Sequence, residues 1–186
     1  NSSSLIYMIN SFIKGSRSSQ SQFIDIDLRK LKEISLKLKN KKVILFGVSY
    51  ALLELSELGT LDLNKWVIME TGGMKGKRKE IIREELHKKL ISSFNVKSIH
   101  SEYGMTEILS QAYSKENGIF NTPPWMKFII RDFEDPYSFA KMNSNGGINI
   151  IDLANLYSCS FIETQDIGRE SKKGNFEILG RFDQAE

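Results

Sequence analysis

The chain has 186 residues, 40% hydrophobic and 26% charged, a composition typical of a folded domain and not of disordered or fibrous proteins. Its formal net charge is +3, too small to indicate a nucleic-acid-binding protein. One cysteine and two histidines exclude a disulfide framework and a metal framework, so we expect a reducing, cytoplasmic location. The longest apolar run, Leu5 to Ile9, is far too short to span a membrane.

The first half of the chain alternates between helical and strand-like patterns. Four segments show the apolar spacing of amphipathic helices, namely 3–14, 27–39, 49–58 and 77–91. Three short, continuous apolar runs are typical of strands buried on both faces, namely 43–47, 66–69 and 96–100. This alternation predicts a parallel sheet with right-handed crossovers and flanking helices.

After residue 112 the helical period disappears. Turn signals at Asn117-Gly118, Asn145-Gly146-Gly147 and Gly174-Asn175 separate β-like runs at 125–133, 148–153 and 175–179. The predicted fold class is therefore α/β, with the parallel sheet followed by a mainly antiparallel β portion. We expect a division into residues 1–112, which are α/β, and residues 113–186, which are rich in β structure.

Glycines, hydroxyls and carboxylates follow each predicted parallel strand. The three segments are Phe46 to Ser49, Glu70 to Gly73 and Ser101 to Glu107. Ligands of open parallel sheets bind beyond the carboxyl ends of the strands, so this edge is the predicted site for a polar ligand. Two common nucleotide motifs are excluded: the glycines of 72–78 have the wrong spacing for a Walker loop, and no Gly-x-Gly-x-x-Gly follows a strand.

The segment Tyr103-Gly104-Met105-Thr106-Glu107, with Gly72-Gly73 upstream and Gly180-Arg181-Phe182-Asp183 downstream, resembles the adenylate-forming superfamily. Thr164-Gln165-Asp166 is similar to the Thr-Gly-Asp of that superfamily, with Gln165 in place of glycine. The nearer likeness is to the acyl-protein synthetases of bacterial luminescence fatty-acid reductases, and phenylacetate-CoA ligases are the neighbouring group. The features that suggest it are Gly72 to Lys75, Pro123-Pro124-Trp125 and Asp166-Ile167-Gly168.

The resemblance implies roles for single residues. Tyr103 would stack on adenine, and Gly72 and Gly73 would let the backbone approach the base. Thr106 would bind the α-phosphate of ATP or AMP, and Glu107 would hold Mg²⁺; these two are the expected catalytic residues.

Asp166 would accept hydrogen bonds from the ribose hydroxyls, and Arg181 would lie near the ribose and phosphate. Gly104 belongs to the same nucleotide-binding motif, and Asp183 would mark a hinge to a mobile lid.

The implied activity is ATP-dependent activation of a carboxylic acid, with fatty acids favoured, as an acyl-adenylate. A thiol of a protein, carrier protein or coenzyme A would then accept the acyl group. Two alternatives stay open: an aryl- or acyl-CoA ligase of the phenylacetate type, and a degenerate nucleotide-binding module without catalysis. The phosphate loop of the superfamily has no match in residues 1–40 and the lid has none before Glu186, so we expect part of a larger N-terminal domain, inactive by itself.

Other residues receive structural interpretations. The basic cluster Lys75, Lys77, Arg78 and Lys79 is expected to form a solvated helix start, or to face an anionic partner. Cys159 is expected to be a small core residue and His87 to be solvated. The aromatic and aliphatic side chains of 125–133 are expected in the core, namely Trp125, Phe128, Ile130 and Phe133.

Overall fold

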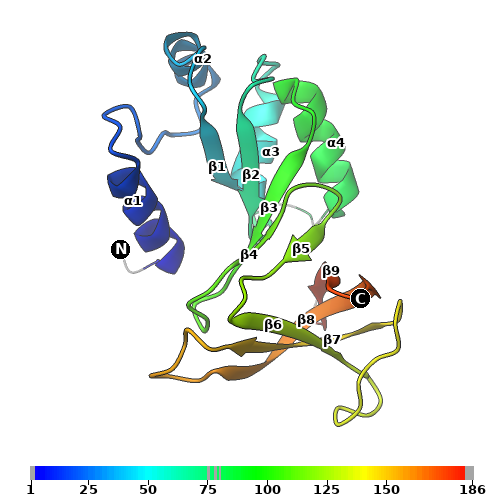
Figure 1. The fold of residues 1–186 in the computed structure, drawn as a ribbon. Coiled ribbons are helices and arrows are strands. Elements are labelled where there is room, and N and C mark those ends of the chain that lie inside the picture. The colour runs from blue at the N-terminus through cyan, green and yellow to red at the C-terminus, as the bar shows by residue number, and fades with distance from the viewer. Residues whose placement is uncertain (1–2, 75, 78, 80, 183–186) are drawn as a thin grey trace.

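The computed structural model describes residues 3–74, 76–77, 79 and 81–182. Within this part, one nine-stranded sheet runs in the order β1-β2-β3-β4-β5-β9-β8-β7-β6 (Figure 1). The helices are α1 (Ser4–Ser16), α2 (Leu28–Lys37), α3 (Ser49–Glu57) and α4 (Arg83–Phe94). The strands are β1 (Ile44–Val48), β2 (Val67–Thr71), β3 (Ile99–Tyr103), β4 (Ala112–Ser114), β5 (Ile119–Asn121), β6 (Met126–Arg131), β7 (Asn145–Asp152), β8 (Phe161–Lys172) and β9 (Asn175–Arg181).

The predicted parallel sheet is confirmed by β1, β2 and β3, which pair in parallel. Helices α3 and α4 are the crossovers, and right-handed connections place them on the same face of the three strands (Figure 1). A hydrophobic cluster lies between these helices and the sheet, with Leu52, Ile68, Leu90 and Phe94 almost fully buried. These residues are the apolar stripes of the two helices and the inward side of β2.

The predicted antiparallel portion is also confirmed. From β3 onward, each neighbouring pair of strands in the sheet is antiparallel. A second cluster, which includes Phe120, Phe128, Ile148 and Ile150, fills the inner face of this half. The cluster also receives Tyr103, so the last residue of the parallel sheet packs into the antiparallel half.

Two of the predicted turns are present. Asn117 and Gly118, at φ values of 57° and 66°, connect β4 to β5, and Gly174 at 83° connects β8 to β9. The third was wrong, because Asn145-Gly146-Gly147 begins β7. A Cβ at Gly147 would lie 2.2 Å from Cζ of Arg131, so this glycine makes room for a neighbouring side chain and not for a turn.

Three strands, β4, β5 and β8, were not predicted from the sequence, and one helix begins at a different residue. The three-residue strands β4 and β5 are too short to show a period, and β8 carries polar residues throughout. Helix α4 begins at Arg83, later than predicted. Lys75, Arg78 and Asp183 lie outside the described residues, whereas Lys77 donates a hydrogen bond to the hydroxyl of Tyr50 at 3.1 Å.

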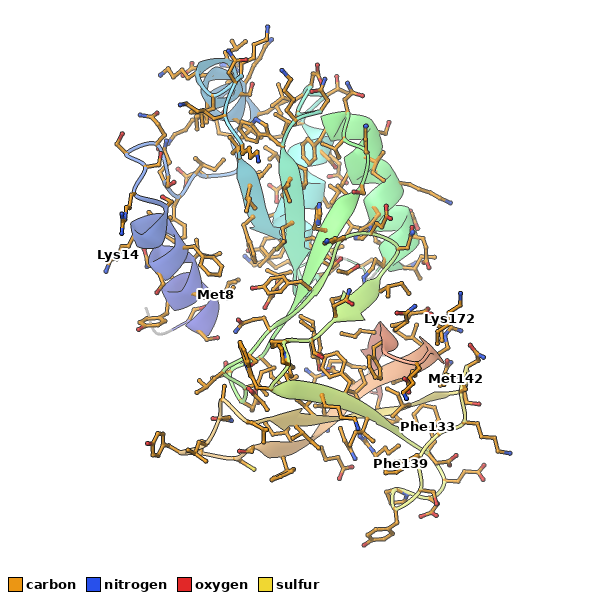
Figure 2. The ribbon with its side chains drawn as sticks, in the orientation of Figure 1. Met8, Lys14, Phe133, Phe139, Met142 and Lys172 are labelled. Atoms are coloured by element: carbon orange, nitrogen blue, oxygen red, sulfur yellow. The ribbon has the colours of Figure 1, made fainter. Side chains whose placement is uncertain are left out.

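Several side chains lie where the sequence did not predict them. Phe128 and Ile130 are buried as expected, but Trp125 is exposed, and so is Phe133, which lies at the same end of the sheet as Phe139 and Met142 (Figure 2). Cys159 is exposed rather than buried. It lies in the segment between β7 and β8, where its Sγ contacts the carbonyl oxygen of Phe161.

Helix α1 has no buried residue and lies to one side of β1 (Figure 1). In the described part of the chain, none of the helices combines the length and the apolar character that crossing a membrane requires.

Candidate functional site

The carboxyl ends of the three parallel strands meet at one edge, as predicted. Val48 is in register with Thr71, and Thr71 with Glu102. The Thr71 hydroxyl donates a hydrogen bond to the carboxylate of Glu102, which is buried. A Cβ at Gly104 would lie 2.5 Å from Oε1 of Glu102. A side chain at Gly104 would therefore force this carboxylate aside, which explains the glycine.

The Gly72-Gly73 loop is held by the start of α3. Gly72 has a φ of 63°, and both glycines are exposed. Ser49 Oγ lies 2.7 Å from the carbonyl oxygen of Gly72 and 2.7 Å from Oε2 of Glu70. The backbone of this loop is thus exposed to solvent, while the contacts of Ser49 with Gly72 and Glu70 fix the start of the loop.

Glu70 is a buried carboxylate beneath this loop. His87 Nε2 lies 3.6 Å and Arg83 Nε 3.8 Å from its Oε1, both from α4. Burial acts to raise the pKa of Glu70, but His87, Ser101, Ser49 and Arg83 outweigh it, and the pKa is below its usual value. The expectation that His87 is solvated was wrong. Its side chain is only 12% exposed, because it packs toward the carboxylate of Glu70 in β2.

Tyr103, Asp166 and Arg181 converge from β3, β8 and β9. The Tyr103 hydroxyl donates a hydrogen bond to Oδ2 of Asp166, and Arg181 Nε lies 3.8 Å from Oδ1 of the same carboxylate. Arg181 also donates to the side-chain oxygen of Gln165 at 3.0 Å. Burial and the adjacent charge of Asp166 raise the pKa of Tyr103 far above its usual range, so the phenol is neutral at physiological pH.

The Tyr103 ring is fixed by aromatic neighbours. Its centroid lies 5.6 Å from that of Phe128 and 6.3 Å from that of Phe120, both in edge-to-face arrangements. The ring is partly exposed. The position of the phenol is therefore set by the second hydrophobic cluster and by Asp166 together.

Thr106 and Glu107 lie in an exposed turn after β3. The Glu107 carbonyl accepts a hydrogen bond from Nδ2 of Asn155 at 2.8 Å, and Thr106 Oγ1 lies 3.4 Å from Oγ of Ser4 in α1. Within the described residues, neither side chain forms a hydrogen bond with Tyr103 or Asp166. The structure thus brings Tyr103, Asp166 and Arg181 together, and leaves Thr106 and Glu107 on the adjoining loop.

Asp152 anchors that loop from β7. It is fully buried and accepts hydrogen bonds from the backbone N–H groups of Leu109 and Ser110, each at 2.9 Å, and from the Ser110 hydroxyl at 2.7 Å. Asp152 therefore holds the end of the loop that carries Thr106 and Glu107, a contact that no sequence motif indicated.

The described residues contain no group of three or more His, Cys, Asp or Glu side chains that could hold a metal ion. Glu107 is a single exposed carboxylate. Mg²⁺ in nucleotide sites commonly uses one or two carboxylates together with phosphate oxygens and water. The donor at Glu107 therefore fits Mg²⁺ that arrives with a nucleotide, and does not fit a metal held by protein ligands alone.

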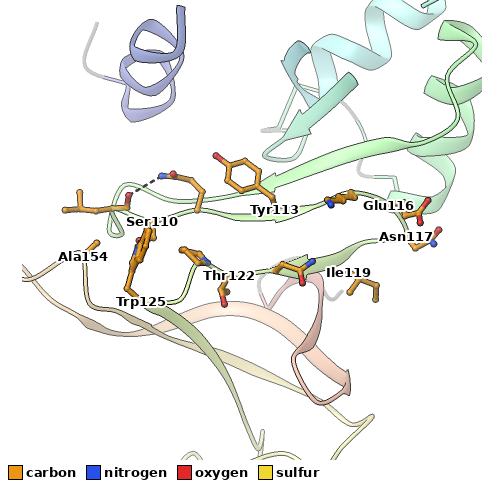
Figure 3. A pocket seen from close by; sticks show the side chains of 13 residues that line it. Ser110, Tyr113, Glu116, Asn117, Ile119, Thr122, Trp125 and Ala154 are labelled. Carbon is orange, nitrogen blue, oxygen red and sulfur yellow. Dashed lines mark hydrogen bonds between the residues drawn. The ribbon is translucent and has the colours of Figure 1, made fainter. Parts of the chain in front are cut away.

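A groove of about 920 Å³ lies between the β4–β5 hairpin and the segment before β6 (Figure 3). Its lining includes Tyr113, Ile119 and Trp125, and the Trp125 indole donates to Oγ of Ser110 at 2.9 Å. Gln111 also lines it, and a Cβ at Gly104 would lie 3.2 Å from Cγ of Gln111. The groove therefore begins beside the loop of Thr106 and Glu107, although Tyr103 and Asp166 do not line it.

Sequence reasoning missed Arg131, which is buried and donates to the carbonyl oxygen of Thr164 at 2.8 Å. A signal was present, because this arginine lies inside the apolar run 125–133, where a charge needs a partner. The Glu70 network was missed as well, since its members are far apart in sequence.

No protein-family model and no curated protein matches the chain. Solved structures do match. They include ATP-bound MatB from Rhodopseudomonas palustris, at a TM-score of 0.61 and 16% identity over 83% of this chain and 33% of that one. A luciferase-like enzyme from the Zophobas morio mealworm gives 0.56 and 18%, over 83% and 40%. The anthranilate CoA ligase AuaEII with anthranoyl-AMP gives 0.53 and 12%, over 87% and 33%.

At these identities the likeness concerns the fold. The chain shares its fold with a part of each of these structures, and this confirms the α/β fold class that the sequence predicts. It spans about a third of the length of MatB, which it matches.

Proposed function

We propose that this chain is the nucleotide-binding part of an ATP-dependent enzyme that activates a carboxylic acid as its acyl-adenylate. The single observation that carries the proposal is the meeting of Tyr103 and Asp166, 63 residues apart, at the carboxyl edge of β3. Both residues lie in segments that resemble motifs of the adenylate-forming superfamily. The chain also shares its fold with solved enzymes such as MatB, which supports this interpretation.

The adenine and ribose are proposed to bind at this pair. The partly exposed Tyr103 ring offers a flat apolar surface for the base, and the exposed backbone of Gly72 and Gly73 allows close approach. An ionised Asp166 accepts hydrogen bonds from ribose hydroxyls, which are charge-assisted and therefore strong. Arg181, half exposed beside Asp166, is positioned for the ribose or the phosphate.

The phosphates are proposed to lie over the following loop. Thr106 offers an exposed hydroxyl to the α-phosphate, and Asp152 and Asn155 fix the loop that carries it. Glu107 would hold Mg²⁺, which neutralises phosphate charge when it is bound. A carboxylate is a poor electrophile. Its oxygen would attack the α-phosphorus of ATP, the bond from that phosphorus to the oxygen bridging to the β-phosphate would break, and pyrophosphate would leave with the electron pair. The acyl-AMP that forms carries AMP as a good leaving group for the later thiol attack, and the contribution of the protein is to hold the two reactants in position.

The acid is proposed to be fatty, with its chain in the groove of Figure 3. The apolar lining by Tyr113, Ile119 and Trp125 supports this assignment. Because Trp125 is exposed and Trp66 is buried, a fatty acid should quench mainly Trp125. Addition of dodecanoate should change the fluorescence of the natural chain and leave Trp125→Phe unaffected; an equal change in both would contradict the assignment.

The acceptor is proposed to be a protein thiol, as in acyl-protein synthetases, in the cytoplasm. A second candidate acceptor is coenzyme A, favoured by the names of two structural neighbours, a malonyl-CoA ligase and an anthranilate CoA ligase. Supplying coenzyme A or a carrier protein to the product of the whole gene, with ATP and a labelled acid, distinguishes the two by which thiol becomes acylated.

Calorimetric titration of the 186-residue chain with AMP tests the proposal. We expect saturable binding, and no acyl-AMP formation from ATP and a panel of acids by this chain alone. The absence of AMP binding would contradict the proposal. AMP binding by the whole gene product without pyrophosphate exchange for any acid would favour a module that binds nucleotide without catalysis.

A further inference from the structure

The segment that carries Asp166 is not a regular strand. On one side of β8, Gly147 pairs with Ile167 and Asn149 pairs with Glu163, so Thr164, Gln165 and Asp166 face a single residue of β7. The pairing of β8 with β9 shifts as well, just after Ile167. Asp166 therefore belongs to a bulge, and bulges need additional contacts to keep one conformation because their ladder hydrogen bonds are lost.

Arg131 supplies such contacts from β6, two strands away. Its guanidinium donates to the carbonyl oxygens of Thr164 at 2.8 Å and Ile148 at 3.2 Å, and to Oδ1 of Asn149 at 2.8 Å. Its Nε lies 3.4 Å from Oε1 of Glu163. Arg131 is 8% exposed, so its charge is satisfied almost entirely by these groups.

Gly147 gives the guanidinium its path across β7. Gly147 is the register partner of Arg131, and a Cβ there would lie 2.2 Å from Cζ and 2.5 Å from Nη2 of Arg131. The planar guanidinium of arginine, lying over a glycine, can reach the next strand with several N–H donors at once. The compact ammonium of lysine cannot form the same set of hydrogen bonds.

The bulge transmits this contact to the carboxylate. The Thr164 hydroxyl donates to the carbonyl oxygen of Ile148 at 2.7 Å and accepts from the Asp166 N–H at 3.1 Å. One residue is thus held by Arg131 at its carbonyl and by β7 at its hydroxyl, and it fixes the backbone of Asp166. The Asp166 carboxylate then receives the Tyr103 hydroxyl.

We propose that Arg131 is a positioning residue, whose buried guanidinium holds the Thr164–Asp166 bulge so that Asp166 presents its carboxylate to the ribose of the bound nucleotide. The effect of Arg131 on nucleotide binding rests on the proposed function. Arg131 does not touch the nucleotide; it acts through Thr164.

Arg131→Lys keeps the charge and removes the fork, and Arg169→Lys is the matched control. Arg169 lies on β8, three residues after Asp166, and its guanidinium pairs with Glu177 of β9 and not with Thr164. The readout is the ratio of dissociation constants for AMP and 2′-deoxy-AMP. A hydrogen bond to a charged group is expected to give the natural chain a preference of about tenfold for AMP. Arg131→Lys should lose most of it and Arg169→Lys none.

Thr164→Val provides a second variant, because it keeps the shape of the side chain and removes only the hydroxyl. It should show the same loss of preference with an unchanged circular dichroism spectrum. Retention of the tenfold preference by folded Arg131→Lys, or by Thr164→Val if Arg131→Lys does not fold, would overturn the inference, even if the melting temperature falls.

Hydrogen exchange without nucleotide separates this inference from the proposed function. In Arg131→Lys the amide of Asp166 should exchange at least about tenfold faster, while the amides of β1 and β2 keep their rates. If the natural chain binds AMP and 2′-deoxy-AMP equally well, the proposed ribose contact fails, and exchange at Asp166 alone decides whether Arg131 holds the bulge. Unchanged exchange would show that it does not.

Discussion

At the scale of single residues, Asp166 occupies the central position. It accepts the Tyr103 hydroxyl through one oxygen and lies 3.8 Å from Arg181 Nε through the other. A carboxylate oxygen can accept more than one hydrogen bond, so Asp166 can also accept from ribose hydroxyls. The chemistry of the proposed site thus depends on one charge more than on any other.

Removal of that charge is the first test. Asp166→Asn should weaken AMP binding by about tenfold, since a charge-assisted acceptor becomes a neutral amide. Asp25→Asn makes the same charge change at an exposed residue in the loop before α2, and should leave AMP binding unaltered. Calorimetric titration of both variants measures the effect. Equal affinities for Asp166→Asn and the natural chain would remove Asp166 from the site.

The lowered pKa of Glu70 predicts how the stability of the fold changes with pH. Its pKa in the folded chain lies below the usual value of 4.5, so it binds protons less readily when folded than when unfolded. Its contribution to stability is therefore present above about pH 4.5 and is lost as the pH falls through its folded pKa.

Glu70→Gln should accordingly flatten the decline of stability on acidification. Urea unfolding between pH 7 and pH 3 would show it, as a smaller difference between the two ends for the variant than for the natural chain. Exposed Glu134 supplies the matched control, because Glu134→Gln lies in the loop after β6 and should keep the steep decline. Parallel pH profiles for the natural chain and Glu70→Gln would contradict the account.

At the scale of elements, the fit of β7 around Arg131 is the tightest feature that bears on the site. Gly147→Ala should lower the free energy of unfolding by about 1–3 kcal/mol, because the added methyl overlaps a buried, hydrogen-bonded guanidinium. Gly15→Ala lies in α1 with nothing within 4 Å of the new methyl, and should stabilise slightly. Urea unfolding of both variants tests the difference in sign, and a neutral Gly147→Ala would contradict it.

The same strand shows where sequence reasoning reached its limit. Apolar runs located β1, β2 and β6, because buried strands select such residues on both faces or on one. Asn145-Gly146-Gly147 indicated a turn, since glycines are usually selected for positive φ. Here Gly147 was selected to admit a side chain from a neighbouring strand, a reason that no local pattern contains.

In the candidate site, too, some features could be predicted from the sequence and others could not. The carboxyl edge of β1 to β3 followed from strand order, and Tyr103 and Asp166 followed from motifs. Their contact did not follow from spacing, since it depends on the bulge in β8 and on Arg131 in β6. The burial of His87 was equally out of reach, because it is caused by Glu70 on a strand beneath the helix.

At the scale of the whole molecule, one sheet joins two hydrophobic clusters. Leu90 is fully buried in the first cluster, and Ile150 in the second. We retain the division at residue 112 as a proposal, although the second cluster also receives Tyr103 and Ile108 from before it. The two portions would then be separate units of local unfolding.

Paired core substitutions test that division. Leu90→Ala and Ile150→Ala should each cost about 2–5 kcal/mol, as expected for buried large-to-small changes. Hydrogen exchange should show faster exchange in β1 to β3 for Leu90→Ala, and in β6 to β8 for Ile150→Ala. If either variant accelerates all of these strands equally, the chain unfolds as one unit and the division fails.

The central claim is that an adenine nucleotide binds where Tyr103 and Asp166 meet. The most direct measurement is a titration of the isotope-labelled chain with AMP, followed by the amide resonances of each residue. We expect saturable shifts at Gly72, Gly73, Tyr103, Thr106 and Asp166. Shifts confined to the residues that line the groove of Figure 3, or no shifts at all, would contradict the claim.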